Sequence, residues 1–323
     1  MFILSNFSAV QKIKKKIWLW FLDSFFPAYC LGCRKEGNFL CNECEKKLLR
    51  LKDQVCPWCY EPRPAGAACL TCLQHSDSLQ KLDVVENISS SEKTENRFLD
   101  GVIVGSKFEQ GSLLQRAIHG FKYDFIEELI DPLGNFLAET LKANLDILTE
   151  VFQTENENIK KSAGLETIYA SAEASIELKQ KNANAANLNP GPAGERLRQI
   201  LLCPLPLHPK RLRWRGFNQS ELLCREVARR FAQSELAAVA VEQFLKRVHF
   251  VRPQMELARE ERMRNVEDVF ALRDDFETPF IQEQTIFLVD DIATTLSTLN
   301  SAAKTLKKAG CKRVYGLVLA RVF

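Results

Sequence analysis

The sequence predicts an α/β protein, with a parallel sheet flanked by helices that follows a small cysteine-rich module near the N-terminus. The first observation is the C-terminal stretch 285–321, which has the pattern of a strand, a loop, a helix and a second strand. The second is that eight of the 11 cysteines lie between positions 30 and 72. The third is a hydrophobic fraction of 46%, with 21 Phe among 323 residues, which is ample for a packed core. This length suggests about two domains.

The cysteine-rich module consists of four C-x-x-C pairs, namely Cys30/Cys33, Cys41/Cys44, Cys56/Cys59 and Cys69/Cys72. A C-x-x-C turn directs two thiolates at one ion, and two such turns complete a tetrahedral four-thiolate shell around zinc. We therefore predict two structural zinc ions in a double zinc ribbon at residues 29–76. The simplest assignment joins neighbouring pairs, so that the first four cysteines bind one ion and the last four the other. Crossed pairing is a second possibility that the spacing leaves open.

Disulfide bonds and an iron–sulfur cluster are the other interpretations of this module. Disulfides need an oxidising compartment, whereas Cys203, Cys224 and Cys311 fall inside predicted strand, helix or turn segments, as ordinary small buried residues do. Zinc is favoured. Because little else in residues 29–76 could form a core, we expect metal binding to supply much of their folding free energy, on the order of 10 kcal/mol per ion.

Residues 1–28 form an amphipathic segment in which Lys12, Lys14, Lys15 and Lys16 precede an apolar and aromatic run, 17–26. That run is too short to span a bilayer and lacks a small-residue cleavage site. Packing on the protein is favoured over a position on a membrane surface. No other stretch approaches the length of a transmembrane segment, so the sequence predicts a soluble, cytoplasmic protein.

Residues 153–195 mark a change of composition, rich in Ala, Asn and Glu and without Phe, Trp, Arg or Cys. Short helices are compatible with part of it. Its Asn-rich end cannot bury enough apolar surface to fold. We interpret it as an insertion in a domain that spans 77–323, and removing it leaves about 200 residues for one α/β domain.

The C-terminal unit carries the chemistry. An apolar run, 286–289, leads into Asp290 and Asp291 and then into four hydroxyl residues, which are Thr294, Thr295, Ser297 and Thr298. A helical pattern, a glycine and a second apolar run follow. The acids therefore lie at the C-terminal edge of the sheet, where open α/β folds bind ligands. The hydroxyls and the free backbone N–H groups of the following helix would suit a phosphate.

This unit resembles the ribose-phosphate binding signature of type I phosphoribosyltransferases. The resemblance implies that Asp290 and Asp291 hold the ribose hydroxyls of phosphoribosyl pyrophosphate and that the hydroxyl loop wraps its 5′-phosphate. Leu296 departs from the pattern, which usually has Gly there, and we expect either an outward side chain with backbone strain or an opened loop. The alternatives are solvated acids or the acidic strand end of an ATPase. An ATPase would need G-x-x-x-x-G-K-[ST], which this sequence lacks, as it lacks G-x-G-x-x-G.

Two basic segments precede this unit. Residues 204–230 contain seven basic and two acidic residues, and residues 245–270 contain six further Lys and Arg before Glu267. A loop this basic beside an acid-edged pocket is suited to a pyrophosphate or to a nucleic-acid backbone. Trp214, among the arginines, is expected either to stack on a base or to anchor the loop. His119 and His208 are not expected to take a direct part.

The sequence R-G-F-N-Q at 215–219, the spaced Arg247, Gln254, Arg262, Asn265 and Phe270, the pair Lys122-Tyr123 and the C-x-x-C pairs together resemble the ComF family of competence proteins. The resemblance implies a double zinc ribbon fused to a phosphoribosyltransferase-type domain that handles incoming single-stranded DNA in the cytoplasm during natural transformation. It implies further competence proteins as partners, including a helicase-type protein, and Mg²⁺ if the protein is catalytic. The expected ligand-binding residues are Thr294, Thr295, Ser297, Thr298, Arg211, Arg215, Gly216, Asn218, Gln219 and Lys122.

Two hypotheses follow for function. In the first, the protein is a transferase that binds phosphoribosyl pyrophosphate through the acids, the hydroxyl loop and the arginines of 211–215, and displaces pyrophosphate. In the second, it is a non-catalytic adaptor that uses the basic loop and the zinc ribbon on single-stranded DNA or on a partner protein. The retained pair of acids favours the first hypothesis, and Leu296 favours the second.

Overall fold

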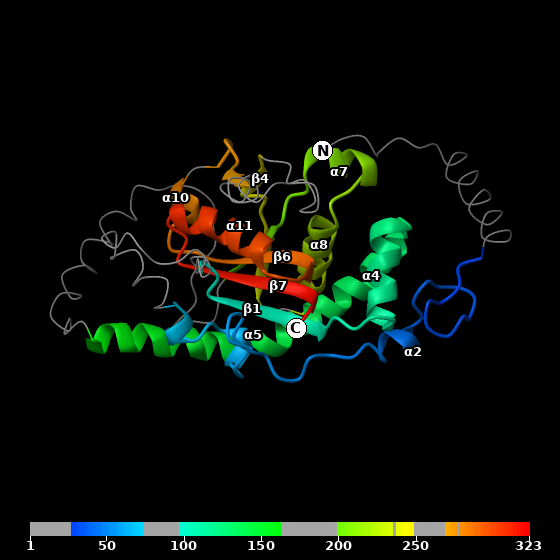
Figure 1. Cartoon of the computed structure of the whole chain (residues 1–323), viewed down its shortest axis with the longest axis horizontal. Coiled ribbons are helices and arrows are strands. Elements are labelled where there is room, and N and C mark those ends of the chain that lie inside the picture. The colour runs from blue at the N-terminus through cyan, green and yellow to red at the C-terminus, as the bar shows by residue number, and fades with distance from the viewer. Residues whose placement is uncertain (1–26, 74–96, 163–198, 235–236, 249–268, 277) are drawn as a thin grey trace, which may run out of the picture.

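The computed structural model describes residues 27–73, 97–162, 199–234, 237–248, 269–276 and 278–323. A central sheet has helices on both faces, and the cysteine-rich module runs along one edge of the sheet (Figure 1). The amphipathic segment up to residue 26, most of the predicted insertion and much of the second basic segment, including Gln254, Arg262 and Asn265, lie outside the described residues.

The main sheet has five parallel strands in the order β1-β7-β6-β2-β3. In that order they are β1 Gly101–Lys107, β7 Arg313–Arg321, β6 Thr285–Ala293, β2 Gln199–Pro204 and β3 Ala238–Val241. Two short strands, β4 Leu245–Arg247 and β5 Phe270–Leu272, form a separate antiparallel pair. The predicted parallel sheet is confirmed, and β6 continues past the two acids, so Asp290 still pairs with Val318 of β7.

Both faces of this sheet are buried, which is why its central strands are apolar without alternation. In β6, Phe287 and Val289 belong to one core cluster, while Ile286 and Leu288 belong to the other. The first cluster contains the buried faces of α4 Leu113–Tyr123, α5 Ile130–Ser162 and α8 Gln219–Ala232. The second contains that of α11 Ser297–Lys308 and lies on the opposite face.

Shorter helices complete the fold. They are α2 Asn42–Glu45, η1 Pro64–Gly66, η2 Glu127–Leu129, α7 Pro209–Arg215 and α10 Thr278–Ile281. The long helix α5 reaches Ser162, so the first ten residues of the predicted insertion are helical. In the described part of the chain, no helix combines the length and the apolar character needed to cross a membrane.

The cysteine-rich module covers the edge of the sheet. β1 is an edge strand, and exposed strand edges invite unwanted pairing. Gln54 closes this edge, because its side-chain amide donates to the carbonyl of Val104 and accepts from the N–H of Val104, both at 2.9 Å. Arg50 reaches from the module to α5, where it donates to the carbonyl of Phe136 at 2.9 Å.

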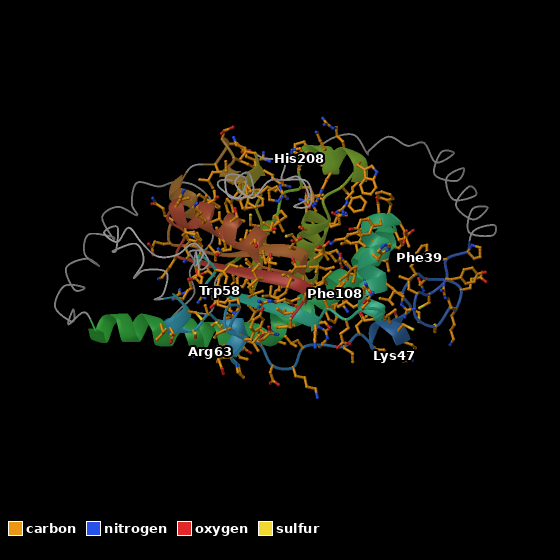
Figure 2. The ribbon with its side chains drawn as sticks, viewed as in Figure 1. Phe39, Lys47, Trp58, Arg63, Phe108 and His208 are labelled. Carbon is orange, nitrogen blue, oxygen red and sulfur yellow. The ribbon has the colours of Figure 1, made fainter. Side chains whose placement is uncertain are left out.

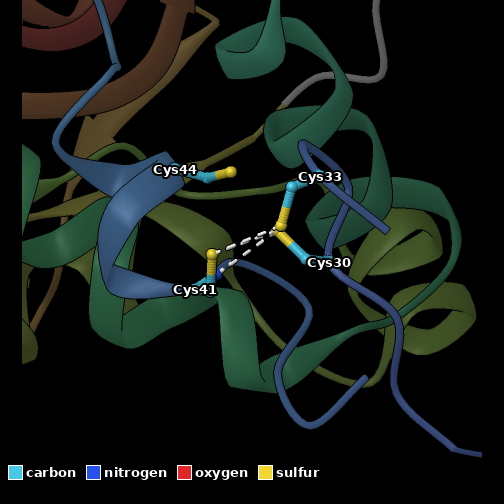
Figure 3. A group of neighbouring side chains, drawn as sticks. All are labelled: Cys30, Cys33, Cys41 and Cys44. Atoms are coloured by element: carbon cyan, nitrogen blue, oxygen red, sulfur yellow. Dashed lines mark hydrogen bonds between the residues drawn. The ribbon is translucent and has the colours of Figure 1, made fainter. Parts of the chain in front are cut away.

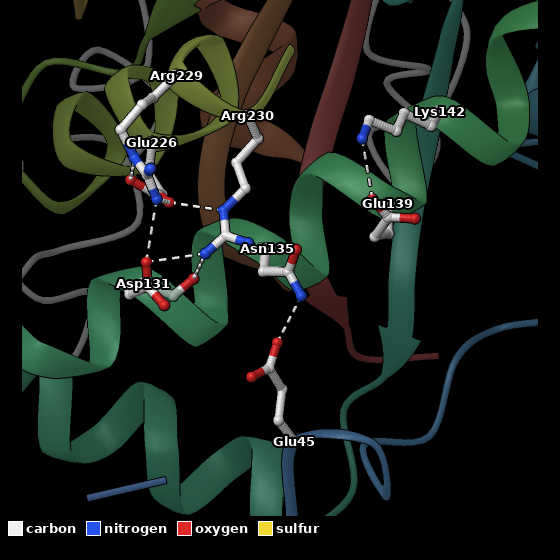
Figure 4. A network of polar contacts seen from close by, with 8 residues as sticks. All are labelled: Glu45, Asp131, Asn135, Glu139, Lys142, Glu226, Arg229 and Arg230. Atoms are coloured by element: carbon white, nitrogen blue, oxygen red, sulfur yellow. Dashed lines mark hydrogen bonds and ion pairs between the residues drawn. The ribbon is translucent and has the colours of Figure 1, made fainter. Parts of the chain in front are cut away.

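A polar network connects Glu45 of the cysteine-rich module to two helices of the α/β domain (Figure 4). Arg230 of α8 donates to Asp131 and Asn135 of α5, each at 2.8 Å, and Asn135 in turn donates to Glu45 of α2. Because partly exposed ion pairs stabilise only weakly, these contacts orient the module more than they hold it.

Candidate functional site

The first cysteine cluster consists of Cys30, Cys33, Cys41 and Cys44, whose sulfur atoms all lie within 4.8 Å of one another. Figure 3 shows these side chains turned toward a common centre. The sulfur of Cys41 lies 3.7 Å from that of Cys30 and 3.6 Å from that of Cys33. A zinc–sulfur bond of about 2.3 Å in a tetrahedron places sulfurs roughly 3.8 Å apart, whereas a disulfide needs about 2 Å. The cluster therefore fits one zinc ion.

The second cluster consists of Cys56, Cys59, Cys69 and Cys72, again within 4.8 Å. The sulfurs of Cys59 and Cys69 are 3.7 Å apart, and the backbone N–H of Cys69 donates to the sulfur of Cys56 at 3.4 Å. Neighbouring C-x-x-C pairs share each cluster, as the simplest assignment predicts, rather than crossed pairs.

A buried cation lies beside the second cluster. Arg321, at the end of β7, is 2% exposed and donates to the carbonyl of Pro57 at 2.7 Å. Burial lowers the pKa of Arg321, while Tyr60 and Cys56 oppose that shift. Four thiolates leave a zinc centre with excess negative charge, so a guanidinium next to Cys56 suits a metal-bound state of this cluster.

The remaining three cysteines are structural, as expected. Burial raises the pKa of both Cys203 and Cys311 to about 12, and it raises that of Cys224 well above its ordinary value. Thiols in this state are inert, because the thiolate is the reactive form.

The two predicted acids lie side by side near the end of β6, but their surroundings differ. Asp291 is 4% exposed, and one of its carboxylate oxygens lies 2.8 Å from the ammonium group of Lys122 on α4. The same oxygen accepts from the backbone N–H of Ile292 at 2.7 Å. This contact between α4 and β6 joins two residues that the sequence had singled out 169 positions apart.

Asp290 is half-buried and accepts a hydrogen bond from the hydroxyl of Ser220 at 3.2 Å. Burial, followed by the charge of Asp291, raises the pKa of Asp290 to about 7, while Lys122 and Ser220 oppose the shift. At neutral pH this carboxyl group is therefore divided between its acid and its ionised form, so it can both donate and accept hydrogen bonds.

The hydroxyl loop between β6 and α11 turns at Leu296. This residue adopts the left-handed conformation, with φ 62°, and precedes the first helical residue, Ser297. Its side chain is 4% exposed and belongs to the core cluster on the α11 face. The expected backbone strain at Leu296 is present, but the expected outward side chain is wrong, because the side chain is buried. Burial of the side chain offsets the strain of roughly 1–2 kcal/mol that the conformation costs.

With the Leu296 side chain directed into the core, the polar groups of the loop face solvent. Thr294, Thr295 and Thr298 are exposed, and the hydroxyls of Thr295 and Ser297 are 2.7 Å apart. The first N–H groups of α11 have no partner within the helix, as at any helix start. Hydroxyls and N–H groups gathered at a helix N-terminus can bind a phosphate.

The R-G-F-N-Q motif forms the turn between α7 and α8. Gly216 takes a left-handed conformation, φ 81°, that ends α7, and Asn218 caps α8 by accepting from the N–H of Ser220. Arg215 donates to the side chain of Gln219 at 3.0 Å. The Nε atoms of Arg215 and Arg247 and the Nε2 atom of Gln219 are buried and have no hydrogen-bond partner among the residues that the structure describes. Gly216 and Asn218 thus have structural roles, and Arg215 and Gln219 keep unused donors.

Two residues near the acids were not among the predicted site residues. Ser220 follows the capping Asn218, and its bond to Asp290 depends on the packing of α8 against β6, which no local pattern reveals. Burial and Arg211 lower the pKa of Arg247 on β4, while Asp290 raises it. Arg247 is one of the residues on which the family resemblance rests, and the Lys-Arg pair at 246–247 could have indicated it as a site residue. Arg247 and Lys122 thus bring positive charge to a pair of acids.

Both histidines make local contacts in the structure, and burial and the charge of Arg247 lower the pKa of His208. His208 caps α7, because its Nδ1 accepts from the N–H of Lys210 at 3.2 Å. Figure 2 shows it far from the cysteine-rich module, whose Lys47 and Arg63 lie at the opposite side of the view. His119 packs against Tyr123, with ring centroids 4.7 Å apart, and lies 3.7 Å from Asp124.

Residues 21–73 match the family model of the double zinc ribbon domain. Three proteins are similar to about a third of the chain. The chain is 33% identical to competence protein F of Haemophilus influenzae over 121 residues, which is 37% of this chain and 49% of that protein. It is 34% identical to DNA utilization protein YhgH of Salmonella typhi over 117 residues, 36% of this chain and 47% of that protein. The corresponding protein of Escherichia coli is 33% identical over 118 residues.

The chain therefore spans about half the length of the relatives that it matches. The double zinc ribbon match falls on the residues that form the two cysteine clusters. The chain carries a double zinc ribbon ahead of a parallel α/β sheet, and over about a third of its length it is a homologue of competence protein F and of the DNA utilization proteins.

Proposed function

We propose that the protein acts in DNA uptake during natural transformation and binds a phosphoribosyl pyrophosphate-type ligand at the C-terminal edge of its sheet. The main support for this ligand is the pair of adjacent acids on β6. Lys122 lies beside these acids, and a helix start lined by hydroxyl groups follows them directly. The similarity to competence protein F and to the DNA utilization proteins supports the role in DNA uptake. Thiolate-bound zinc suits the reducing cytoplasm, where we place the protein.

In this proposal each group has one task. Asp290 and Asp291 accept hydrogen bonds from the two ribose hydroxyls, and Thr294, Thr295, Ser297, Thr298 and the N-terminus of α11 hold the 5′-phosphate. The basic side chains Arg211, Arg215 and Lys122 face the pyrophosphate, with Gln219 adding an amide donor. Lys122 has to exchange Asp291 for a phosphate oxygen when the ligand binds, since one ammonium cannot fully serve both.

Mg²⁺ would supply charge neutralisation to the pyrophosphate if the protein is a transferase. The donor set does not favour a dedicated ion site on the protein. Lys122 already occupies Asp291, and Ser220 and the N–H of Asp291 already donate to Asp290. We therefore assign no protein ligands to Mg²⁺, which would have to enter with the pyrophosphate.

Isothermal titration with phosphoribosyl pyrophosphate and Mg²⁺ tests the ligand. The double variant Asp290→Asn/Asp291→Asn is expected to weaken binding at least tenfold, about 1.4 kcal/mol. Removing carboxylates ordinarily strengthens the binding of a polyanion, so a loss would identify specific contacts to the ribose. Asp53→Asn/Asp146→Asn is the matched control, because it makes the same two substitutions at exposed positions outside the site. Unchanged or tighter binding by the site variant would sink the assignment.

The second candidate is a non-catalytic adaptor on the same fold, bridging single-stranded DNA and other competence proteins such as a helicase-type partner. The ion pair between Lys122 and Asp291 favours it, because one of the two acids is already satisfied without a ligand. Release of pyrophosphate in the presence of candidate acceptors separates the two. Binding of the ligand without any turnover would favour the adaptor.

A further inference from the structure

Three aromatic side chains form an exposed patch where the end of α4 meets α7. Tyr123 is 47% exposed, Phe125 40% and Trp214 61%. We call these three residues the aromatic patch. Single exposed aromatics are common on protein surfaces, but a contiguous group of them marks an interaction site.

Two members of the aromatic patch contact each other directly, and the third is joined to them through Arg215. The rings of Phe125 and Trp214 meet edge to face, with centroids 5.5 Å apart. The guanidinium carbon of Arg215 lies 5.4 Å from the centre of the Tyr123 ring and 5.9 Å from that of Trp214. A cation thus lies between two rings and fixes their spacing. This arrangement gives several flat apolar faces at the surface with little freedom left to lose on binding.

The backbone at Phe125 is strained in a way that maintains the patch. Its φ is 55°, a left-handed conformation that costs a side chain with a Cβ roughly 1–2 kcal/mol. The strain does not serve to bury the ring, which stays 40% exposed against Trp214. Strained backbone that presents a functional group is characteristic of binding sites.

The charge around the aromatic patch has one sign on α7. This helix carries Lys210, Arg211, Arg213 and Arg215 and no acid. Arg211 and Arg213 are exposed on either side of Leu212, and the nearby Asp124 faces His119 at 3.7 Å. A surface that binds single-stranded nucleic acid needs exposed flat rings, on which the bases stack, and exposed cations, which contact the phosphates.

We propose that single-stranded DNA binds across the aromatic patch, with bases stacked on Trp214 and Phe125 and phosphates held by Arg211 and Arg213. Duplex DNA is disfavoured as the occupant, because its base faces are covered within the stack. A protein partner would need several acids to match α7, and the rings alone would not select it. This inference rests on the proposed role in DNA uptake and identifies the surface at which the DNA would bind.

Fluorescence anisotropy with a labelled oligothymidylate of about 20 nucleotides tests the proposal on the full chain. Trp214→Ala is expected to weaken binding at least about fivefold, because it removes a stacking face. Trp214→Phe keeps a ring and should recover much of that loss. Tyr29→Ala removes a comparably exposed ring, 48% exposed, from the zinc ribbon and serves as the control.

The salt dependence of the same binding tests the phosphate contacts. Arg211→Ala/Arg213→Ala should reduce the slope of log affinity against log salt by about 1.4, since each phosphate contact on a single strand contributes about 0.7. Lys35→Ala/Lys47→Ala removes two exposed charges from the zinc ribbon and should leave the slope almost unchanged. An equal effect of both double variants would overturn the placement on α7.

Arg211 is assigned both to this surface and to the proposed ligand site, so the Trp214 variants, which change the aromatic patch alone, separate the two. Wild-type affinity in Trp214→Ala, or equal affinity for the duplex form, contradicts the surface even if phosphoribosyl pyrophosphate binds. Loss in Trp214→Ala with normal ligand titration supports the surface alone. Trp214→Ala could lose affinity because it lowers the stability of the protein or because it removes a stacking face. Trp214→Phe separates these two causes, because it has to restore affinity if stacking is the cause.

Discussion

The two halves of the zinc ribbon are held in different ways. In the first half, Cys30, Cys44, Leu40 and Leu48 join the same core cluster as α4, α5 and α8. In the second half, Cys56, Cys69 and Cys72 form a small separate cluster with Trp58 and Ala68 packed against it, and contact with the main core comes from Ala65 and from Trp58. The sheet differs from both, because two extensive apolar clusters cover its faces. The contrast indicates that metal replaces a core most completely in the second half and not at all in the sheet.

Metal removal should produce the largest effect. The protein is expected to contain about two equivalents of zinc, and chelation should unfold the ribbon at a cost on the order of 10 kcal/mol per ion while sparing the sheet. Within the ribbon, the amides around Cys56 and Cys69 should lose protection from hydrogen exchange first, because no large core remains there. Elemental analysis that finds no zinc, or iron with a visible absorption band, would contradict this.

A core substitution in the sheet should give the converse result. Phe287 is completely buried in the middle of β6, and Phe287→Ala is expected to cost about 3–5 kcal/mol of unfolding free energy. Zinc content should stay at two equivalents, because none of the eight zinc-binding cysteines lies on β6, although Phe287 shares the first core cluster with Cys30 and Cys44. Denaturant unfolding and metal analysis of the same sample measure both. Loss of zinc in this variant would show that ribbon and sheet fold as one unit.

Leu296 connects the core to the proposed phosphate loop. Leu296→Ala should cost about 2–3 kcal/mol through lost burial, and Leu296→Gly should be about 1 kcal/mol less destabilising than the Ala variant. Glycine adopts the left-handed conformation without strain, whereas alanine has a Cβ and therefore retains the strain. Because the loop already has this conformation, Leu296→Gly should change ligand affinity less than about twofold. If the Ala variant is more stable than the Gly variant, the backbone at position 296 is not strained.

The smallest expected effect concerns the pH dependence of stability. The raised pKa of Asp290, about 7 against an ordinary 3.8, means that the folded protein keeps a proton that the unfolded chain loses. The stabilisation from that proton is present at low pH and is lost as pH rises through 7. Asp290→Asn resembles the protonated acid and lacks this loss. Between about pH 5.5 and 8, its stability relative to wild type should rise by about 1–2 kcal/mol. A constant difference would show an ordinary pKa.

Periodicity and spacing were enough to predict the strand, loop, helix and strand of the C-terminal unit, because apolar runs of that kind are specific to buried parallel strands. The cysteine spacing predicted two four-cysteine sites, since a C-x-x-C turn directs both thiols at one ion, but it left open which pairs share a site, because that depends on how the turns pack together. The side-chain direction at Leu296 could not be predicted, because it depends on a space that α11 and β6 create together. The contacts of Ser220 with Asp290 and of Phe125 with Trp214 are equally tertiary, and no local pattern encodes them.

A co-crystal structure with ribose 5-phosphate tests the central claim, the ligand site at the end of β6, most directly. The account predicts the phosphate against the hydroxyls and N–H groups of residues 294–298, and the ribose hydroxyls on Asp290 and Asp291. It also predicts that the 2.8 Å contact between Lys122 and Asp291 is retained, because this ligand lacks the pyrophosphate that would draw the lysine away. A ligand bound only to the arginines of α7, with the loop at 294–298 empty, would contradict the account.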